Sequence, residues 1–285
     1  VRADGRRVGA GFSSFVERTG YPSARFLAAR RSRYGVHESV TLRANRTGGI
    51  DLFTGVASMG QSTETTIAQV CAQVYGLDFD RVKVHAGDTG SSPLNTGSFS
   101  SRTMIAAAAA VKEAATALPH NTLRIAAYRP RLPPGHLVIY VQLVHHPRHP
   151  ALAPPRRAHP PAAPRRRGTP TARGPGLEAT SHWEPEAAAF AFGSAAAVVS
   201  VDVETGDFDI ERFVFVHDSG TLVNPVVVEG QARGALAQGF GAALAEELRY
   251  DPETGQLVNG SMLDYFVPTA ADLPEVELQH TEVPS

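Results

Sequence analysis

Cysteine is nearly absent from this chain, because Cys71 is the single one among 285 residues. One thiol cannot form an intrachain disulfide, and it cannot supply the set of cysteines that holds an iron–sulfur cluster. Cys71 falls on the apolar face of an expected helix, so we interpret it as a small core residue rather than as a nucleophile. The chain must therefore fold without an intrachain disulfide framework.

Long apolar runs are also missing, although 42% of the residues are apolar. No run approaches the ~20 residues that a membrane-spanning helix needs. The first residues, VRADGRRVGAG, begin without Met and lack the charge-then-apolar pattern of a signal peptide. We expect a cytoplasmic protein without a membrane span, and the sequence reads as the middle of a longer protein. Its length allows one large domain or two small ones.

The common nucleotide and hydrolase motifs are absent as well. There is no GxxxxGK(S/T) phosphate loop, no GxSxG, no HExxH and no CxxC. The GFG at residues 239–241 lies inside a helical pattern and does not follow a strand, which argues against a Rossmann fingerprint. Any cofactor would have to be held by glutamines, hydroxyl groups and backbone N–H groups, and it would have to bring its own metal ligands.

Acidic residues and lysine are missing from Arg129–Pro175, which holds nine Arg, 12 of the 21 Pro and five of the 11 His. The net charge of −1 hides this asymmetry, because the rest of the chain carries 18 basic and 28 acidic residues, or about −10. Proline at this density opposes regular structure. The segment could be a disordered basic linker, a nucleic-acid-binding arm or an out-of-frame translation of a G+C-rich gene. We favour the out-of-frame hypothesis, which translation of the other two frames would test.

The patterns that are present begin with Thr54–Val74, which reads as a strand end, a glycine turn and a helix. Gly55 and Gly60 give the turn its backbone freedom, and Ser62 or Thr63 can cap the helix. The apolar spacing predicts a helical face made of Ile67, Val70, Cys71 and Val74.

Gln61 has no structural role in this pattern. It lies at the start of the helix, where free N–H groups favour an anion or a phosphate-bearing cofactor. The alternative interpretation of the whole stretch is an ordinary strand–turn–helix joint, since helix starts far outnumber ligand sites. The stretch by itself leaves both interpretations open.

A second polar stretch, Gly87–Arg102, repeats this arrangement. It follows an expected strand and leads directly into a helix over Thr103–Leu118, which includes five consecutive alanines and so suits a central, closely packed position. Its serines and threonines could serve turn chemistry only. Two such loops within ~40 residues nevertheless favour a shared ligand.

A third stretch is the helix expected over Pro225–Leu248, with Asn224 as its N-cap and Pro225 at its first position. Four glycines in this helix cost stability, ~1 kcal/mol each against alanine, and imply close approach of another backbone or of a ligand. Gln231 and Gln238 share one face with Gly234 between them, which suggests a polar ligand there.

Alternating apolar residues and turn residues predict the strands. The first hairpin joins His37–Ala44 to Ile50–Thr54, and the helix that follows it ends at Gly76. The second hairpin joins Ser194–Val203 to Phe208–Val216, and its alternation changes phase after Ile210, which permits a bulge. The expected strands are His37–Ala44, Ile50–Thr54, Arg81–Ala86, Ser194–Val203, Phe208–Val216, Gly260–Pro268 and Val276–His280.

Three motifs in this order resemble the molybdopterin-binding large subunit of the xanthine dehydrogenase, aldehyde oxidase and carbon monoxide dehydrogenase family. The motifs are SMGQSTETTIAQV, GDTGSSPLNTGSFSSR and NPVVVEGQARGALAQGFGAALAEEL. The resemblance covers Val1–Tyr128 and Gly176–Ser285, and it fails across the Arg/Pro-rich segment. It implies an α+β fold with short mixed sheets, hairpins and long glycine- and alanine-rich helices that line a cofactor pocket.

The resemblance also implies a domain organisation for a fragment of such a subunit. Residues 1–128 would form the first part of a molybdopterin-binding domain, and residues 176–285 the second part, with the irregular segment 129–175 between them. The family's cofactor is molybdenum–molybdopterin, in some members as the cytosine dinucleotide. The residues that match its cofactor-binding motifs are Gly60, Gln61, Phe99, Ser100, Ser101, Arg102 and Gln238.

By this resemblance Gly60 and Gln61 would contact the pterin. The four residues Phe99–Arg102 would hold the pterin or its phosphate through backbone N–H groups and side chains. Gln238 would contact the pterin from the second half of the domain. At Ser62 the family usually has the second glycine of a GQG, and we expect a Cβ there to crowd the cofactor.

The family hydroxylates a purine, aldehyde or N-heterocycle with water as the oxygen donor, or oxidises carbon monoxide. We expect its general-base glutamate beyond Ser285, so no residue here receives a catalytic or metal-ligating role. Electrons would leave through iron–sulfur and FAD partner subunits, in a homodimer of heterotrimers. We expect the fragment alone to be inactive. The alternatives are a basic nucleic-acid-binding protein acting through Arg129–Arg173, with steeply salt-dependent binding, or a non-functional gene fragment.

Overall fold

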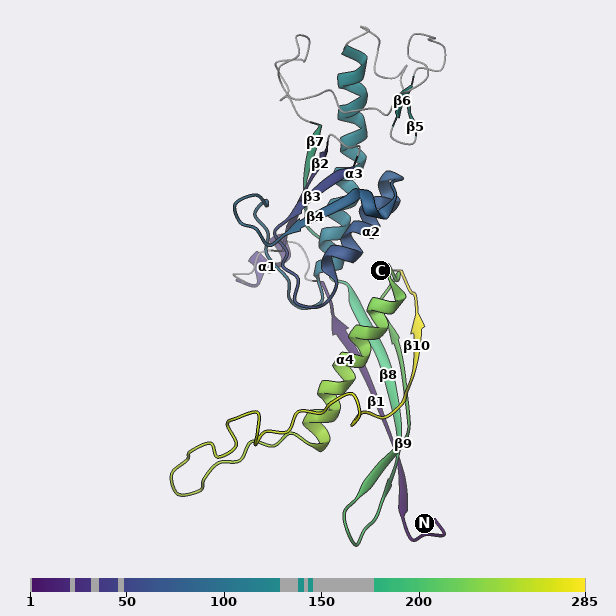
Figure 1. The fold of residues 1–285 in the computed structure, drawn as a ribbon, viewed down its shortest axis with the longest axis vertical. Helices are drawn as coiled ribbons and strands as arrows, with labels where there is room; N and C mark the ends of the chain where they lie inside the picture. Colours follow the sequence, from purple (N-terminus) through teal and green to yellow (C-terminus); the bar gives the residue numbers. More distant parts are fainter. Residues whose placement is uncertain are drawn as a thin grey trace. The chain divides into compact units, whose positions relative to one another are not determined.

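The computed structural model describes residues 2–20, 24–31, 36–45, 49–128, 138–140, 143–145 and 177–284 (Figure 1). The chain divides into two compact units. The terminal unit combines Val1–Glu17 with Phe190–Ser285, and the central unit is Arg18–Ala189. Most of the Arg/Pro-rich segment lies outside the described residues, except for the short antiparallel strands β5 (Val138–Tyr140) and β6 (Leu143–His145).

The central unit is built on a four-stranded sheet in the order β4-β3-β2-β7 (Figure 1). β2 pairs antiparallel with β3 and β7, whereas β3 and β4 are parallel. Two long helices pack against each other, and a short helix α1 precedes the sheet in the chain. The bounds are α1 Ala24–Ala29, β2 Glu38–Ala44, β3 Ile50–Thr54, α2 Thr63–Tyr75, a 3-10 turn Phe79–Arg81, β4 Val82–Ala86, α3 Thr103–Tyr128 and β7 Glu178–Trp183.

Period-2 alternation places the core of the central unit where the sequence predicts it. Val40 and Leu42 of β2 and Ile50 and Leu52 of β3 are buried on one face of the sheet. The alanines of α3 form most of the opposing surface, which lets that helix approach the sheet closely; the buried ones are Ala106, Ala107, Ala110, Ala114 and Ala115. The predicted central position of this helix is confirmed, although it continues past Leu118 to Tyr128.

Helix α2 confirms the core interpretation of Cys71 and corrects its predicted face. Cys71 is fully buried, and burial raises the pKa of its thiol to about 12. Val74, in contrast, is 42% exposed, so it does not belong to the buried stripe. Thr63, Thr66, Ala68 and Ala72 are buried instead, so the buried side of α2, which packs against α3 and β4, includes small residues and threonines. The predicted end at Gly76 is confirmed by its left-handed φ of +70°.

The terminal unit is built on a second four-stranded sheet, in the order β1-β8-β9-β10. β8 and β9 form the predicted hairpin, and β9 and β10 are parallel. Val198 pairs with Arg212 and Val199 with Ile210, so Glu211 is an extra residue and the bulge predicted after Ile210 is confirmed. The bounds are β1 Arg7–Arg18, β8 Phe190–Val201, β9 Phe208–Asp218, α4 Pro225–Leu244 and β10 Val276–Thr281.

Helix α4 begins as predicted and ends earlier. Asn224 is its N-cap and accepts a hydrogen bond from the Val227 N–H at 3.3 Å. The helix ends at Leu244 rather than Leu248. Helix α4 contacts β9 of the sheet through an edge-to-face pair between Phe240 and Phe213, whose ring centroids are 5.0 Å apart.

The strand predicted over Gly260–Pro268 is wrong, because this part of the chain forms turns. The Ser261 hydroxyl donates to the Asp264 carboxylate at 2.8 Å, and the Asp264 N–H donates back to the Ser261 carbonyl at 3.0 Å. Such local side-chain bonds offer the backbone an alternative to a sheet ladder. The short strand predicted at Val276–His280 is confirmed as β10.

Candidate functional site

Two polar loops leave the same edge of the central sheet. The first loop, residues 55–62, connects β3 to α2, and the second loop, residues 87–102, connects β4 to α3. Because β3 and β4 are parallel, their carboxyl ends meet at one edge, and both loops therefore lead into the N-termini of packed helices there. In open α/β sheets, ligands bind outside the carboxyl ends of the strands. The structure thus brings together the two loops for which the sequence favoured a shared ligand.

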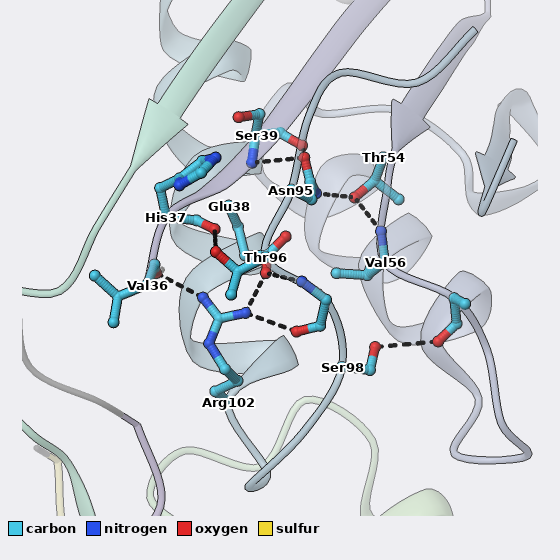
Figure 2. Close-up of polar contacts among 12 residues, drawn as sticks. Val36, His37, Glu38, Ser39, Thr54, Val56, Asn95, Thr96, Ser98 and Arg102 are labelled. Carbon is cyan, nitrogen blue, oxygen red and sulfur yellow. Dashed lines mark hydrogen bonds and ion pairs between the residues drawn. The ribbon is translucent and has the colours of Figure 1, made fainter. Parts of the chain in front are cut away.

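The two loops are joined by direct hydrogen bonds (Figure 2). The carbonyl oxygen of Ala57 accepts a hydrogen bond from the Ser98 hydroxyl at 3.1 Å. The Asn95 amide donates to the Thr54 hydroxyl at 3.3 Å, and the Gly87 N–H donates to the Thr54 carbonyl at 3.2 Å. The second loop is therefore held against the end of β3 and the start of the first loop.

Gly55 and Gly60 serve the first loop in different ways. A Cβ at position 55 would lie 2.9 Å from both the Asn95 Cβ and the Pro93 carbonyl oxygen, so Gly55 permits close approach of the second loop. Gly60 has a φ of +93° and open space around it, and it therefore supplies the predicted backbone freedom. Only the role of Gly60 matches the sequence-based interpretation, because Gly55 has no positive φ.

Gln61 has a structural role that the sequence did not reveal. Its Oε1 accepts a hydrogen bond from the Met59 N–H, and its Nε2 donates to the Ala57 carbonyl at 3.3 Å. The side chain thus closes the first loop upon itself. The interpretation of Gln61 as structurally idle is wrong, because a half-buried amide within reach of two main-chain groups satisfies both of them.

Ser62 begins α2 without capping it by its side chain. Its φ is +59°, in the left-handed region, and its side chain makes no capping hydrogen bond, although its carbonyl accepts from the Thr66 N–H at 3.0 Å. The predicted hydroxyl cap is therefore wrong. A left-handed backbone favours glycine, which provides a backbone reason for a glycine at this position in addition to the crowding that we expected.

The second loop ends in a tight turn made of two left-handed serines. Ser100 has a φ of +50° and Ser101 a φ of +52°, and the Arg102 N–H donates to the Phe99 carbonyl across them at 3.2 Å. Positive φ at both central positions is the geometry of a type I′ turn, which usually contains Asn or Gly. Within the described part of the chain, the N–H groups of Ser100 and Ser101 have no hydrogen-bond acceptor.

Arg102 turns its side chain inward. Its side chain is 2% exposed, and its guanidinium forms an ion pair with Glu38 and donates to the carbonyls of Val36 at 2.6 Å and Gly97 at 2.7 Å (Figure 2). The Phe99 ring lies 5.3 Å from the guanidinium carbon. Sequence reasoning missed Glu38, whose only signal was an acidic residue at the start of an expected strand.

Gln238 lies on α4 in the terminal unit, where its side chain is exposed, as is that of Gln231. A Cβ added at Gly230, Gly234 or Gly239 would meet no described atom within 4 Å. Gly241 differs, because a Cβ there would lie 2.9 Å from the Pro268 ring. The glycines of α4 predicted close approach of another group. Among the described residues of the terminal unit, that approach occurs at Gly241 and not at the other three α4 glycines.

Several buried polar atoms around the two loops lack a partner. In the described ranges these include Glu38 Oε2, Thr63 Oγ1 and Ser92 Oγ. Cβ atoms at Gly60 and Gly97 would meet nothing within 4 Å, so both loops have open space beside the chain. Buried polar groups normally have partners. Unpaired N–H groups, hydroxyls and open glycines together are suited to a ligand rich in acceptors, such as a pterin or a phosphate.

A family model described as "Molybdopterin cofactor-binding domain" matches residues 1–274. The chain belongs to this family. It is 32% identical to the nicotine 6-hydroxylase large subunit of Paenarthrobacter nicotinovorans, over all of this chain and 35% of that protein. It is 32% identical to the carbon monoxide dehydrogenase large chain of Afipia carboxidovorans, over 87% of this chain and 30% of that protein. The chain thus spans about a third of the length of these relatives.

Solved structures agree with this membership. Quinoline 2-oxidoreductase from Pseudomonas putida 86 matches with a TM-score of 0.78 and 32% identity, over 99% of this chain and 36% of that chain. The Cu,Mo-CO dehydrogenase matches with the same TM-score and 30% identity, over 98% of this chain and 35% of that chain. The expected α+β fold and the resemblance to molybdenum hydroxylase large subunits are confirmed, and the nucleic-acid alternative is not favoured.

The described residues contain neither a membrane-spanning helix nor a cluster of metal-ligating side chains. No helix among them has the length and apolar character needed to cross a bilayer. No group of three or more His, Cys, Asp and Glu side chains among them is arranged to hold a metal ion.

Proposed function

We propose that this chain forms part of the pocket for a molybdenum–molybdopterin cofactor in an oxidoreductase. The observation that carries this proposal is the joining of two glycine loops at one sheet edge, each followed by a helix N-terminus, with N–H groups at Ser100 and Ser101 that have no acceptor among the described residues. Free N–H groups at helix N-termini favour anionic and acceptor-rich groups. Membership in the molybdopterin-binding family supports the same ligand.

The residues present fit such a cofactor through hydrogen-bond donors rather than through metal ligands. Gly60 and Gln61 would contact the pterin from the first loop, and the turn Phe99–Arg102 would hold the pterin or its phosphate. Here the N–H groups of Ser100 and Ser101 would donate, whereas the guanidinium of Arg102 is already engaged inside the unit. Gln238 would contribute from the terminal unit. If the cofactor is the cytosine dinucleotide form, donors of the same kind would hold its phosphates.

The bound cofactor would supply the redox chemistry, which is hydroxylation of a purine, aldehyde or N-heterocycle with water as oxygen donor, or oxidation of carbon monoxide. The chain's own residues would bind and orient the cofactor. With one cysteine, this chain cannot itself hold the iron–sulfur relay, so electrons would pass to iron–sulfur and FAD partners. The relatives' designations as large subunits support such partners. We therefore propose a cytoplasmic homodimer of heterotrimers, and no turnover by the 285-residue chain alone.

The test is the cofactor content of the complete complex that carries this chain. We expect molybdenum and pterin to copurify with it and the Gln61→Ala variant to carry less of both, because the first loop loses its closing amide. Gln73→Ala, an exposed glutamine on α2, is the matched control and should leave the content unchanged. Elemental analysis for molybdenum and fluorescence of the oxidised pterin measure the outcome. Equal content in parent and Gln61→Ala would count against the assignment.

A further inference from the structure

The ion pair between Glu38 and Arg102 joins the start of β2 to the end of the second loop, across 64 residues of sequence. Both side chains are almost completely buried, with exposed fractions of 0% and 2%. Glu38 Oε1 also accepts a hydrogen bond from the Gly97 N–H at 3.2 Å, while Arg102 donates to the Gly97 carbonyl at 2.7 Å. The pair therefore binds both polar groups of the Gly97 backbone.

Stability alone does not account for this arrangement. Removing two charges from water is costly, and well-packed apolar residues often stabilise a core as well or better. The second carboxylate oxygen, Glu38 Oε2, is buried with no partner among the described residues, so the carboxylate is incompletely satisfied. What a buried ion pair does provide is a single defined geometry for the groups that it contacts.

The geometry in question is that of residues 97–102. The ion pair fixes this segment at both ends, at Gly97 and at Arg102, and the two serines with positive φ lie between them in the sequence. Left-handed serines are unfavourable by themselves and persist when the surroundings determine them. Two further bonds hold the approach to the segment, since Thr96 donates to the His37 carbonyl and Asn95 to the Ser39 carbonyl, at 2.9 and 3.1 Å.

We propose that Glu38 is a positioning residue which, through Arg102 and Gly97, holds the second loop in the turn that presents the Ser100 and Ser101 N–H groups to the pterin cofactor. This inference rests on the proposed function, because the cofactor is the ligand that the turn would serve. It assigns to Arg102 an internal role in place of direct contact by its guanidinium.

The experiment compares two altered pairs with a matched control in the complete complex. Glu38→Gln/Arg102→Gln removes both charges together and so leaves no unpaired buried charge, whereas Glu38→Asp keeps the charge on a shorter side chain. Thr41→Val is the control, because Thr41 lies on the same strand as Glu38 but away from the loop. The substitution removes its hydrogen bond to Thr180 of β7, which has a length of 2.8 Å. Pterin per folded protein is read from fluorescence, and amide hydrogen exchange is read over residues 96–103.

We expect about tenfold less pterin in the double variant, as outer partners of a binding site typically contribute. Glu38→Asp should show a smaller loss, and it decides the question if the double variant does not fold. Exchange should accelerate at the Gly97 and Arg102 N–H groups, while Thr41→Val retains its pterin. Normal pterin content in the altered pairs, or an equal loss in Thr41→Val, would overturn the proposal.

Failure of the proposed function is distinguishable from failure of this inference. If the parent complex carries no pterin, the proposed function fails, and the exchange measurement still reports on the loop. Faster exchange confined to residues 96–102 in the altered pairs then supports the positioning of the turn. Unchanged exchange there overturns it.

Discussion

The helices of the two units differ in what they bury. In the central unit, α2 and α3 cover one face of the sheet, and their buried residues form a continuous core with Leu42 and Leu52. In the terminal unit, α4 buries only Ala232 and Gly241 among its described residues, and Val226 is 80% exposed. The helices of the central unit bury an apolar face within that unit. In contrast, α4 has a surface of glycines and glutamines that the described residues of the terminal unit do not cover. Packing among the described residues of the terminal unit therefore requires glycine at position 241, and it does not require the glycines at positions 230, 234 and 239.

The largest effect should come from breaking the buried charge of the central unit. Arg102→Met leaves the Glu38 carboxylate buried and unpaired, which should cost about 3–5 kcal/mol in the free energy of unfolding. The matched change in the terminal unit is Arg212→Met, which breaks an ion pair with Glu277 whose side chains are 62% and 51% exposed. Exposed pairs contribute little, so this variant should unfold like the parent in urea. Equal destabilisation by the two would remove the contrast between the units.

Glycine substitutions should change stability in opposite directions in the two units. Gly55→Ala places a Cβ 2.9 Å from the Pro93 carbonyl oxygen and should destabilise the central unit by about 1–3 kcal/mol. Gly234→Ala meets no described atom and should stabilise α4 by about 1 kcal/mol. Thermal unfolding measures both. If Gly234→Ala also lowers pterin content in the complete complex, the open face of α4 serves the cofactor or another part of the protein.

Removing the left-handed backbone strain at Ser62, just before α2, should change the stability of the central unit by a smaller amount. Ser62→Gly should stabilise the central unit by about 1 kcal/mol, because glycine adopts a φ of +59° without a Cβ penalty. Ser62→Ala is the control and should be nearly neutral, since the serine hydroxyl makes no capping bond. A loss of stability in Ser62→Ala comparable to the loss of an N-cap would show that the hydroxyl does cap the helix.

The smallest expected effect is a pH dependence confined to the terminal unit. His217 Nε2 lies 2.9 Å from His280 Nδ1 across β9 and β10. Burial, and then the neighbouring His280, lowers the pKa of His217 below its ordinary 6.5, and Asp218 opposes this shift. Folding therefore favours the neutral form of His217. Its contribution to the free energy of unfolding is present above pH 6.5 and is lost as the pH falls through the lower pKa of His217 in the folded protein. Amide exchange of β10 should accelerate at acidic pH, and His280→Gln should weaken that dependence.

Local patterns made most of the fold predictable. The alternation at Val40 and Leu42, the cap at Asn224 and the bulge after Ile210 all depend on neighbours in sequence, and the structure confirms each. Two of the failures depend on distant or main-chain partners. The role of Gln61 follows from two backbone groups, and the role of Glu38 follows from an arginine 64 residues away, which no local spacing reveals. Gly260–Pro268 failed because Ser261 and Asp264 bond each other locally.

The junction between the two loops lies at a main-chain atom, the carbonyl oxygen of Ala57, which accepts from Gln61 and from Ser98. A side-chain substitution at position 57 keeps that oxygen, so an alanine or glycine scan of the first loop would leave the acceptor that joins the loops in place. Replacing the amide between residues 57 and 58 by an ester would weaken the oxygen as an acceptor while keeping every side chain. Residue-by-residue mutagenesis would therefore rank position 57 as unimportant, although both loops depend on its backbone.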